Sequence, residues 1–299
     1  MAKRVSRKKK ANSSNNYRDG KLDSSRPDSK PALIALLLVV ILIGSGLYLT
    51  SMVDTEETVT SPTYGVKAEL VTNDHRAEPG GETDFVILVE NTGTFTDTFT
   101  ISTKSNDGGF TIDIEDGFET IMLNKNVRKP LLINVKTPSS AEGLLYAYIE
   151  VVSGGDTTKS AEVRLNVNTN NNFGNLTKVG DSVDVHYAGI LASNAKLFDS
   201  SMEYIWDNYI YRRDGVTNDN RHTSTLPASN IGCIEANNPS EDCEGSKGMI
   251  SGFDSKMVGM YEGQTLAVRI PAKDAYGETG GSDLAGEDLI FIIEMVTIN

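Results

Sequence analysis

The sequence predicts a mainly β protein in which one transmembrane helix precedes two domains. Three observations predict this: an apolar stretch without charges near the start, short runs of alternating apolar and polar residues further on, and a length of 299 residues, enough for two ordinary domains. Two cysteines exclude a disulfide-dense mini-fold or a zinc ribbon, and three widely separated histidines (75, 186 and 222) indicate no metal site. The net charge of −13 argues against nucleic acid as a partner.

The N-terminal region combines a basic tail with a long apolar segment. Residues 1–30 contain ten Lys or Arg against three Asp, a net charge of +7. The segment Ala32–Val53 has 22 residues without a charge, and as an α-helix it would be about 33 Å long, enough to cross a hydrocarbon core of about 30 Å. Because only a helix satisfies its own backbone in lipid, we expect residues 31–53 to form a transmembrane helix. The basic cluster Arg7–Lys10 either fixes the topology or binds anionic lipid.

A cleaved signal peptide is the alternative interpretation of this segment. The 30 residues before it and the length of the apolar run exceed those of an ordinary signal peptide, although Gly44–Gly46 offers small residues to a peptidase. In either case residues 54–299 lie outside the cytoplasm. The expected location is the cytoplasmic membrane, as a single-pass protein with its N-terminus inside and residues 54–63 as a polar stalk.

Residues 64–168 have the pattern of an antiparallel β-sandwich. Short alternating runs are separated by turn formers such as Pro79-Gly80-Gly81 and Gly154-Gly155-Asp156, and no helical periodicity occurs. Phe85, Ile87 and Val89 share one face and are expected in the core. The predicted strands lie near Val66–Thr72, Thr83–Glu90, Thr96–Thr103, Thr111–Ile114, Glu119–Leu123, Arg128–Lys136, Leu144–Val152 and Ser160–Val167.

The run PGGETDFVILVENTGTFTDTFTIS (79–102) resembles Ig-like sandwich modules of archaeal and bacterial surface proteins. This resemblance implies a structural spacer or a protein-binding module and no catalytic site. His75 beside Asp74, and the acidic pair Glu115-Asp116, are expected to be solvated loop residues. Residues 169–177 form a polar linker to the last domain.

Beyond the linker the pattern changes to a mixture of strands and one short helix. Val183, Val185 and Tyr187 share one face of a strand, so His186 is expected on the surface or on the second face. Phe253 and Met257 have the spacing of a short amphipathic helix that ends at Gly259.

Five segments of residues 178–299 resemble the FKBP-type peptidyl-prolyl cis-trans isomerases, in the order of that family. They are VGDSVDVHYAGIL, LFDSS, MISGFDSKMVGMYEGQ, VRIPAKDAYGE and LIFIIEMVTI. The resemblance implies an α+β domain in which a curved antiparallel sheet wraps around a short helix. It also implies an apolar cavity that receives proline.

The family's cavity residues can be transferred one by one to this sequence. The resemblance assigns catalysis to Tyr187, Phe198, Asp199, Ile250 and Tyr276, and substrate binding to Met249, Phe253, Leu284 and Phe291. Asp199 matches the aspartate near the twisting carbonyl, and the floor residue, most often Trp in the family, is Phe253 here. One family position, an aromatic on the strand after the loop, cannot be assigned.

Rotation about an X–Pro bond explains why such residues suffice. The barrier of about 18–20 kcal/mol arises because amide resonance is lost in the twisted state. An apolar cavity strips water from the amide and binds the twisted shape better than either planar isomer. The chemistry needs no nucleophile, metal or cofactor.

Residues 202–248 form an insertion relative to typical family members. It begins with four aromatic residues between Tyr204 and Tyr211, which either capture unfolded chains or pack onto the domain's own sheet. It also contains Cys233 and Cys243, for which a disulfide is expected outside the cytoplasm, a redox-active pair being the alternative.

Together these features predict a membrane-anchored peptidyl-prolyl isomerase that assists the folding of exported or surface proteins. Its expected partners are proline-containing polypeptides outside the cytoplasm, and the membrane through one helix. The alternative is a catalytically inactive FKBP-like binding module in a cell-surface scaffold protein.

Overall fold

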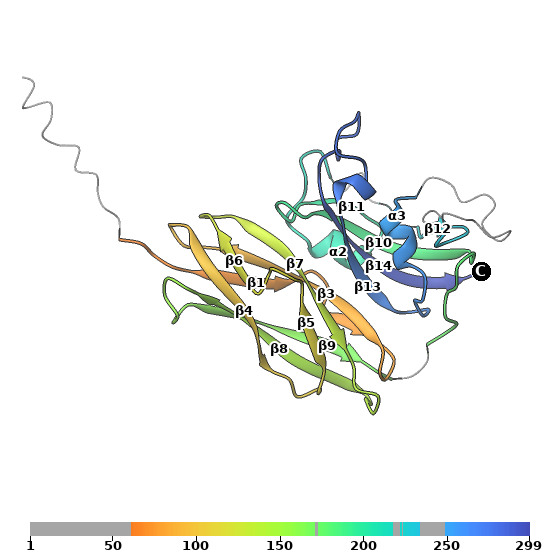
Figure 1. The fold of residues 1–299 in the computed structure, drawn as a ribbon, viewed down its shortest axis with the longest axis horizontal. Coiled ribbons are helices and arrows are strands. Elements are labelled where there is room, and N and C mark those ends of the chain that lie inside the picture. The colour runs from red at the N-terminus through yellow and green to blue at the C-terminus, as the bar shows by residue number, and fades with distance from the viewer. Residues whose placement is uncertain (1–60, 171–172, 218–221, 223, 234–248) are drawn as a thin grey trace, which may run out of the picture. The chain divides into compact units, whose positions relative to one another are not determined.

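The computed structural model describes residues 61–299 except 171–172, 218–221, 223 and 234–248. Residues 61–299 form one compact unit that is mainly β (Figure 1). In the described part of the chain, none of the helices is long and apolar enough to cross a bilayer. The expected tail and transmembrane helix lie outside the described residues, so both stay predictions.

The first nine strands form two sheets that pack against each other. Their orders are β1-β3-β7-β5 and β2-β9-β8-β4-β6. A strand lies at each of the eight expected positions, and β2 is additional. The strands are β1 (Val66–Leu70), β2 (Asp74–Arg76), β3 (Glu82–Asn91), β4 (Asp97–Ser105), β5 (Thr111–Ile114), β6 (Thr120–Leu123), β7 (Arg128–Lys136), β8 (Leu144–Ser153) and β9 (Ser160–Asn168).

The core between the two sheets follows from the alternation of side chains along each strand. Phe85, Ile87 and Val89 of β3 point into it as expected, and they pack with residues of the facing sheet such as Phe99 and Ile149. This arrangement is a β-sandwich with one contiguous apolar core.

Strand β3 is buried on both faces, which alternation alone does not predict. Its other face carries Val86 and Leu88, which are 1% and 3% exposed and pack in a second cluster with residues of the C-terminal domain. Alternate side chains of the apolar run FVILV therefore pack in two cores, one inside the sandwich and one against the C-terminal domain.

His75 is not the solvated loop residue that the sequence suggested. It lies on β2, which pairs in parallel with β9, and its ring stacks on Phe85 with a centroid distance of 4.0 Å. Its Nδ1 lies 3.0 Å from the Thr83 hydroxyl, and its Nε2 contacts the Thr72 hydroxyl. Burial lowers the pKa of His75 to about 3, against a small opposing effect of Asp84. The expectation was wrong because these two hydroxyls satisfy a ring that the surrounding core excludes from water.

The C-terminal domain contains a third sheet, which is antiparallel, and short helices. Its strand order is β11-β10-β14-β13, and β12 also pairs with β10. The elements are β10 (Val183–Leu191), β11 (Leu197–Ser200), α2 (Glu203–Asn208), β12 (Leu226–Ala228), α3 (Ser251–Lys256), β13 (Thr265–Ile270), the 3₁₀-helix η3 (Ala272–Asp274) and β14 (Leu289–Ile298).

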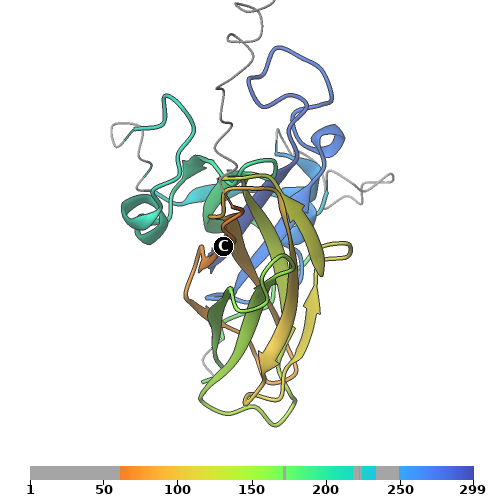
Figure 2. The same ribbon diagram turned by 90° about the vertical axis from the view of Figure 1, so that its left-hand side faces the viewer.

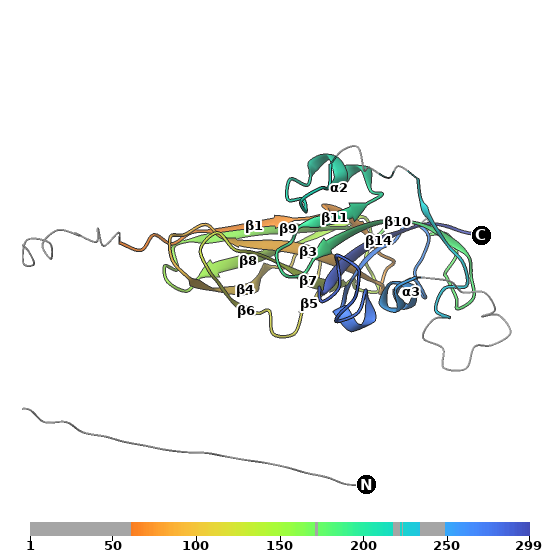
Figure 3. The same cartoon turned by 90° about the horizontal axis from the view of Figure 1, so that it is seen from above.

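The two helices α2 and α3 lie on opposite faces of this sheet (Figure 3). Phe253 and Met257 at α3 pack with Val183 and Val185 on one face. Ile205 and Trp206 of α2 pack on the other face, which also meets the sandwich. The dark blue connection from η3 to β14 projects away from the sheet (Figures 1 and 2).

The expected insertion is not one continuous loop outside the C-terminal sheet. The chain leaves after β11 and returns at β12, whose residues 226–228 pair with β10 on the same edge as β11. It then leaves again before α3. The expected boundaries 202–248 therefore enclose a strand of the domain itself.

The aromatic start of the insertion is mainly structural. Trp206 and Tyr209 are 1% and 8% exposed, and the Tyr211 ring lies under the Arg128 guanidinium of the sandwich at 3.1 Å. Tyr204 and Ile210 remain exposed. The packing alternative thus holds for Trp206, Tyr209 and Tyr211.

The sandwich also covers the edge strand β13 with polar contacts. The Asp84 carboxylate accepts hydrogen bonds from the Ala267 N–H at 3.1 Å and from Lys256 of α3 at 3.0 Å. The Thr83 hydroxyl donates to the Thr265 carbonyl at 2.7 Å. Because an uncovered edge would leave backbone groups unpaired, the sandwich completes the sheet that carries α3.

Glu115 contributes to the same interface, contrary to the expectation of a solvated loop residue. Its carboxylate forms a bidentate ion pair with Arg269 of β13, and its side chain is 17% exposed. It also accepts a hydrogen bond from the Leu132 N–H at 3.0 Å. Asp116 is exposed, as expected.

Candidate functional site

A small apolar cavity of about 190 Å³ lies between the sheet and α3. It is on the sheet face opposite to the sandwich, because Tyr187 and Phe291 point away from the cluster that meets β3. Among the described residues that line it, Asp199 alone carries a formal charge. The lining residues are Tyr187, Phe198, Asp199, Leu226, Met249, Ile250, Phe253, Tyr276 and Phe291.

Phe291 of β14 is the centre of the aromatic packing in this cavity. The rings of Phe198 and Phe253 meet it edge to face, with centroid distances of 5.6 and 5.1 Å. Tyr187 lies 6.2 Å from Phe253, also edge to face. Such edge-to-face pairs are favourable, so the rings that line the cavity also stabilise one another's orientation.

Gly189 of β10 makes room for the wall residue Phe198. It pairs with Phe291 on β14 and with Asp199 on β11. A Cβ atom at this position would lie 2.3 Å from Cζ of Phe198. Only glycine lets the Phe198 ring lie across β10, so the sequence Tyr187-Ala188-Gly189 fixes one wall of the cavity.

Helix α3 provides the floor of the cavity. Phe253, 3% exposed, points from its first turn toward the sheet, and Met257 packs below it. Ile250 is the N-cap residue, and its carbonyl accepts the Asp254 N–H at 3.0 Å. The predicted helix therefore forms. Gly259, with φ of 82°, reverses the chain just beyond it.

Asp199 and Tyr187 form the polar corner of the cavity. The Tyr187 hydroxyl donates to Oδ2 of Asp199 at 2.5 Å. Burial, and then the Asp199 carboxylate, raise the pKa of Tyr187. Burial and the same carboxylate also raise the pKa of Tyr276, which is 42% exposed. Both phenols therefore stay protonated at neutral pH and keep a hydrogen to donate, Tyr187 to Asp199 and Tyr276 to a ligand.

The structure brings together eight of the nine predicted catalytic and substrate-binding residues. The exception is Leu284, which is 9% exposed and packs in the apolar cluster without lining the cavity. The Leu284 side chain thus packs in the core although the connection to β14 that carries it projects from the sheet (Figure 1).

Leu226 is the cavity residue that the sequence did not reveal. It lies on β12 opposite Val185 of β10 and lines the cavity. No local pattern marks the three-residue strand Leu226–Ala228, and only its pairing with β10 identifies it.

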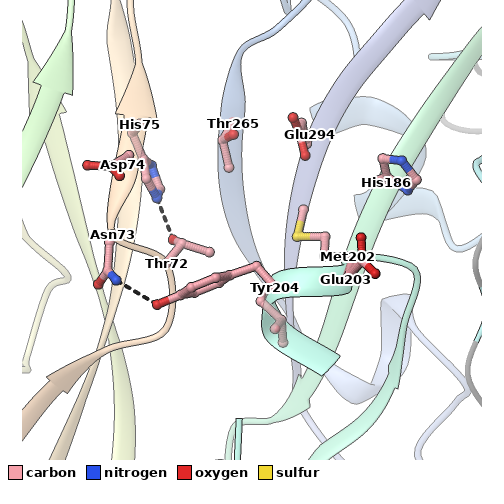
Figure 4. A pocket seen from close by; sticks show the side chains of 11 residues that line it. Thr72, Asn73, Asp74, His75, His186, Met202, Glu203, Tyr204, Thr265 and Glu294 are labelled. Atoms are coloured by element: carbon pink, nitrogen blue, oxygen red, sulfur yellow. Dashed lines mark hydrogen bonds between the residues drawn. The ribbon is translucent and has the colours of Figure 1, made fainter. Parts of the chain in front are cut away.

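A larger cavity of about 400 Å³ lies where the sheet meets the sandwich (Figure 4). His186 and Glu294, neighbours on β10 and β14, lie in its wall together with Asp74 and Glu203. His186 is on the second face of β10 as expected, and its Nδ1 lies 3.2 Å from the Ser201 hydroxyl. This charged lining does not suit a proline ring, so we take the smaller aromatic cavity as the candidate site.

Of the two cysteines, Cys233 is 6% exposed. Cys243 lies outside the described residues, so the pairing Cys233–Cys243 stays a prediction.

Likenesses to solved structures are weak. The PapD-like domain of human CEP192 aligns with 13% identity and a TM-score of 0.26, covering 34% of this chain and 81% of that one. Domains 4 and 5 of the S-layer protein SbsC align with 15% identity and a TM-score of 0.23, covering 36% and 53%. These scores assign no fold, and the Ig-like character of the sandwich stays a prediction.

The sequence comparisons are specific to the C-terminal domain. Residues 231–296 match the family model described as FKBP-type peptidyl-prolyl cis-trans isomerase. FK506-binding protein 2 of Candida glabrata is 29% identical over 121 residues, 40% of this chain and 65% of that protein. The probable FK506-binding protein of Corynebacterium glutamicum is 29% identical over 119 residues, 40% and 72%. The FK506-binding protein of Streptomyces anulatus is 30% identical over 128 residues, 42% and 77%. Through its C-terminal domain, the chain belongs to the FKBP family of peptidyl-prolyl cis-trans isomerases.

Proposed function

We propose that the protein is a membrane-anchored peptidyl-prolyl cis-trans isomerase that acts on proline-containing polypeptides outside the cytoplasm. The observation that carries the enzymatic part is the aromatic cavity with one carboxylate, Asp199, held by the Tyr187 hydroxyl at 2.5 Å. It offers the two things that rotation about X–Pro requires, a dry apolar surface and a fixed charge beside it.

The catalytic role of each residue follows from its place in the cavity. The proline ring enters between Phe198, Phe253 and Phe291, and the amide that precedes it loses its water. A twisted amide is less charge-separated than a planar one, so this surface binds the twisted state more tightly. Asp199 orients the twisting carbonyl by its field, and the Tyr276 hydroxyl donates to the substrate backbone. Apolar residues before proline should be preferred, because Met249 and Ile250 offer them apolar contact.

Membrane attachment rests on the sequence of the first 53 residues. The uncharged segment Ala32–Val53 follows a tail of net charge +7, an arrangement that favours a cytoplasmic N-terminus. On intact cells, added protease should digest residues 54–299, and the protein should stay in the membrane fraction. Protection of residues 54–299 from external protease would contradict this topology.

Outside the cytoplasm, Cys233 and Cys243 are proposed to form a disulfide.

The activity is best tested on residues 61–299, since truncation at residue 169 would uncover β13 and the apolar face against β3. The assay is the isomerisation rate of a tetrapeptide with Leu before proline. Asp199→Ala and Tyr187→Phe should each lower kcat/KM about tenfold or more, whereas His186→Gln, on the other face, should leave it unchanged. Binding of the peptide without acceleration would instead support the alternative, an inactive binding module in a surface scaffold.

A further inference from the structure

Asp199 has a second partner that the family resemblance did not indicate. His222 lies between α2 and β12, and its Nε2 is 3.4 Å from Oδ1 of Asp199. Since Tyr187 donates to Oδ2, each carboxylate oxygen has its own contact. The His222 side chain is 59% exposed, at the rim of the cavity rather than inside it.

The contact of His222 with Asp199 is important because the cavity contains few charged side chains. Asp199 contributes the one formally charged side chain among the described lining residues. The Asp199 side chain is 32% exposed, so water screens its charge only in part and its field reaches a ligand in the apolar cavity. An imidazolium in contact with it opposes that field, whereas a neutral imidazole does not. Histidine ordinarily changes its charge near pH 6.5, within the physiological range.

Among the described residues, the two tyrosines of the cavity do not change charge in that range. Tyr187 on β10 and Tyr276 after η3 have raised pKa values and stay neutral. Of the chain's other two histidines, His75 is buried in the sandwich with a pKa of about 3. His186 lies on the opposite face of the sheet beside Ser201. His222 is therefore the histidine whose charge is in contact with the site.

We propose that His222 is a positioning residue that acts on the substrate through Asp199. This inference rests on the proposed isomerase function. With His222 neutral, the full charge of Asp199 faces the substrate amide. When His222 is protonated, the imidazolium binds Oδ1 and cancels part of that charge. Activity should therefore fall when His222 is protonated.

The test is the pH profile of kcat/KM for residues 61–299 between pH 5.5 and 8. The wild-type protein should lose about two- to fivefold toward pH 5.5, the range expected of a partly exposed ion pair. His222→Gln should flatten the profile. His186→Gln, the matched control, should keep the wild-type slope. High salt should reduce the slope of the wild-type profile.

A second measurement does not depend on activity. The affinity of residues 61–299 for the proline tetrapeptide should vary with pH only when both His222 and Asp199 are present. A wild-type slope in His222→Gln, or a peptide affinity of Asp199→Asn that still varies with pH as in wild type, would overturn the inference. An inactive protein whose peptide affinity still follows His222 would refute the isomerase function and leave the inference standing.

Discussion

Substitution of Trp206 tests whether the aromatic start of the insertion is part of the core or captures substrate. Its side chain is 1% exposed and packs between the C-terminal sheet and Val86 and Leu88 of β3. The Arg212 guanidinium lies 5.0 Å from its ring. Replacing a fully buried large aromatic residue by alanine typically costs about 3–5 kcal/mol of unfolding free energy. We expect Trp206→Ala to lose that amount.

The unpaired indole nitrogen of Trp206 leads to a different expectation for the stability of Trp206→Phe. Among the described residues, the buried Nε1 of Trp206 has no hydrogen-bond partner. An unsatisfied buried donor costs about 1–3 kcal/mol, and Trp206→Phe removes it together with part of the ring. The two effects oppose each other, so Trp206→Phe should stay within about 1 kcal/mol of wild type.

The assay is urea unfolding of residues 61–299 followed by far-UV circular dichroism, because both substitutions remove the chain's one tryptophan and its fluorescence. The matched control is Tyr204→Ala on the same helix. Its side chain is 50% exposed and its hydroxyl accepts a hydrogen bond from Asn73 at 2.6 Å, so the loss should be about 1 kcal/mol or less. Wild-type stability of Trp206→Ala, combined with slower refolding catalysis on a proline-limited protein, would refute the packing argument and restore substrate capture.

Two further predictions follow from buried groups. His75 is neutral in the folded protein with a pKa of about 3 but titrates near 6.5 when unfolded, so the unfolded state binds more protons between these values and stability falls as the pH drops. Urea unfolding should show a loss of about 2 kcal/mol from pH 7 to pH 5, and a similar loss in His75→Gln would contradict the assignment. Gly189→Ala should displace Phe198 and lower kcat/KM about tenfold. Gly281→Ala is the control, because a Cβ atom there meets no atom within 4 Å. Equal activity of the two variants would contradict the role of Gly189 in positioning the Phe198 wall.

Local patterns were sufficient for most of the strands and for α3, and the family resemblance was sufficient for most of the cavity. Alternation located the inward-facing Phe85, and the helical spacing of Phe253 and Met257 located α3, because both signals depend on neighbours in sequence. What failed depends on contacts between distant segments. The sequence does not show that His75 and Glu115 are shielded from solvent, because their partners, Phe85 and Arg269, are not adjacent to them in the chain.

The same reason explains the remaining differences at the site. Leu226 was missed because a three-residue strand carries no periodicity, and Leu284 was expected in the cavity although the folded connection buries it. The apolar run FVILV is consistent with burial of β3 on both faces, but the sequence does not show that the C-terminal sheet covers Val86 and Leu88.

That shared strand has a consequence for the order in which the chain matures. β3 is synthesised about 200 residues before β14, whose Ile290 and Ile292 belong to the cluster that covers its outer face. During that interval the completed sandwich presents a bare apolar stripe of Val71, Val86 and Leu88. We expect the C-terminal sheet to assemble on this stripe, and the two halves to unfold in a single cooperative transition rather than one after the other.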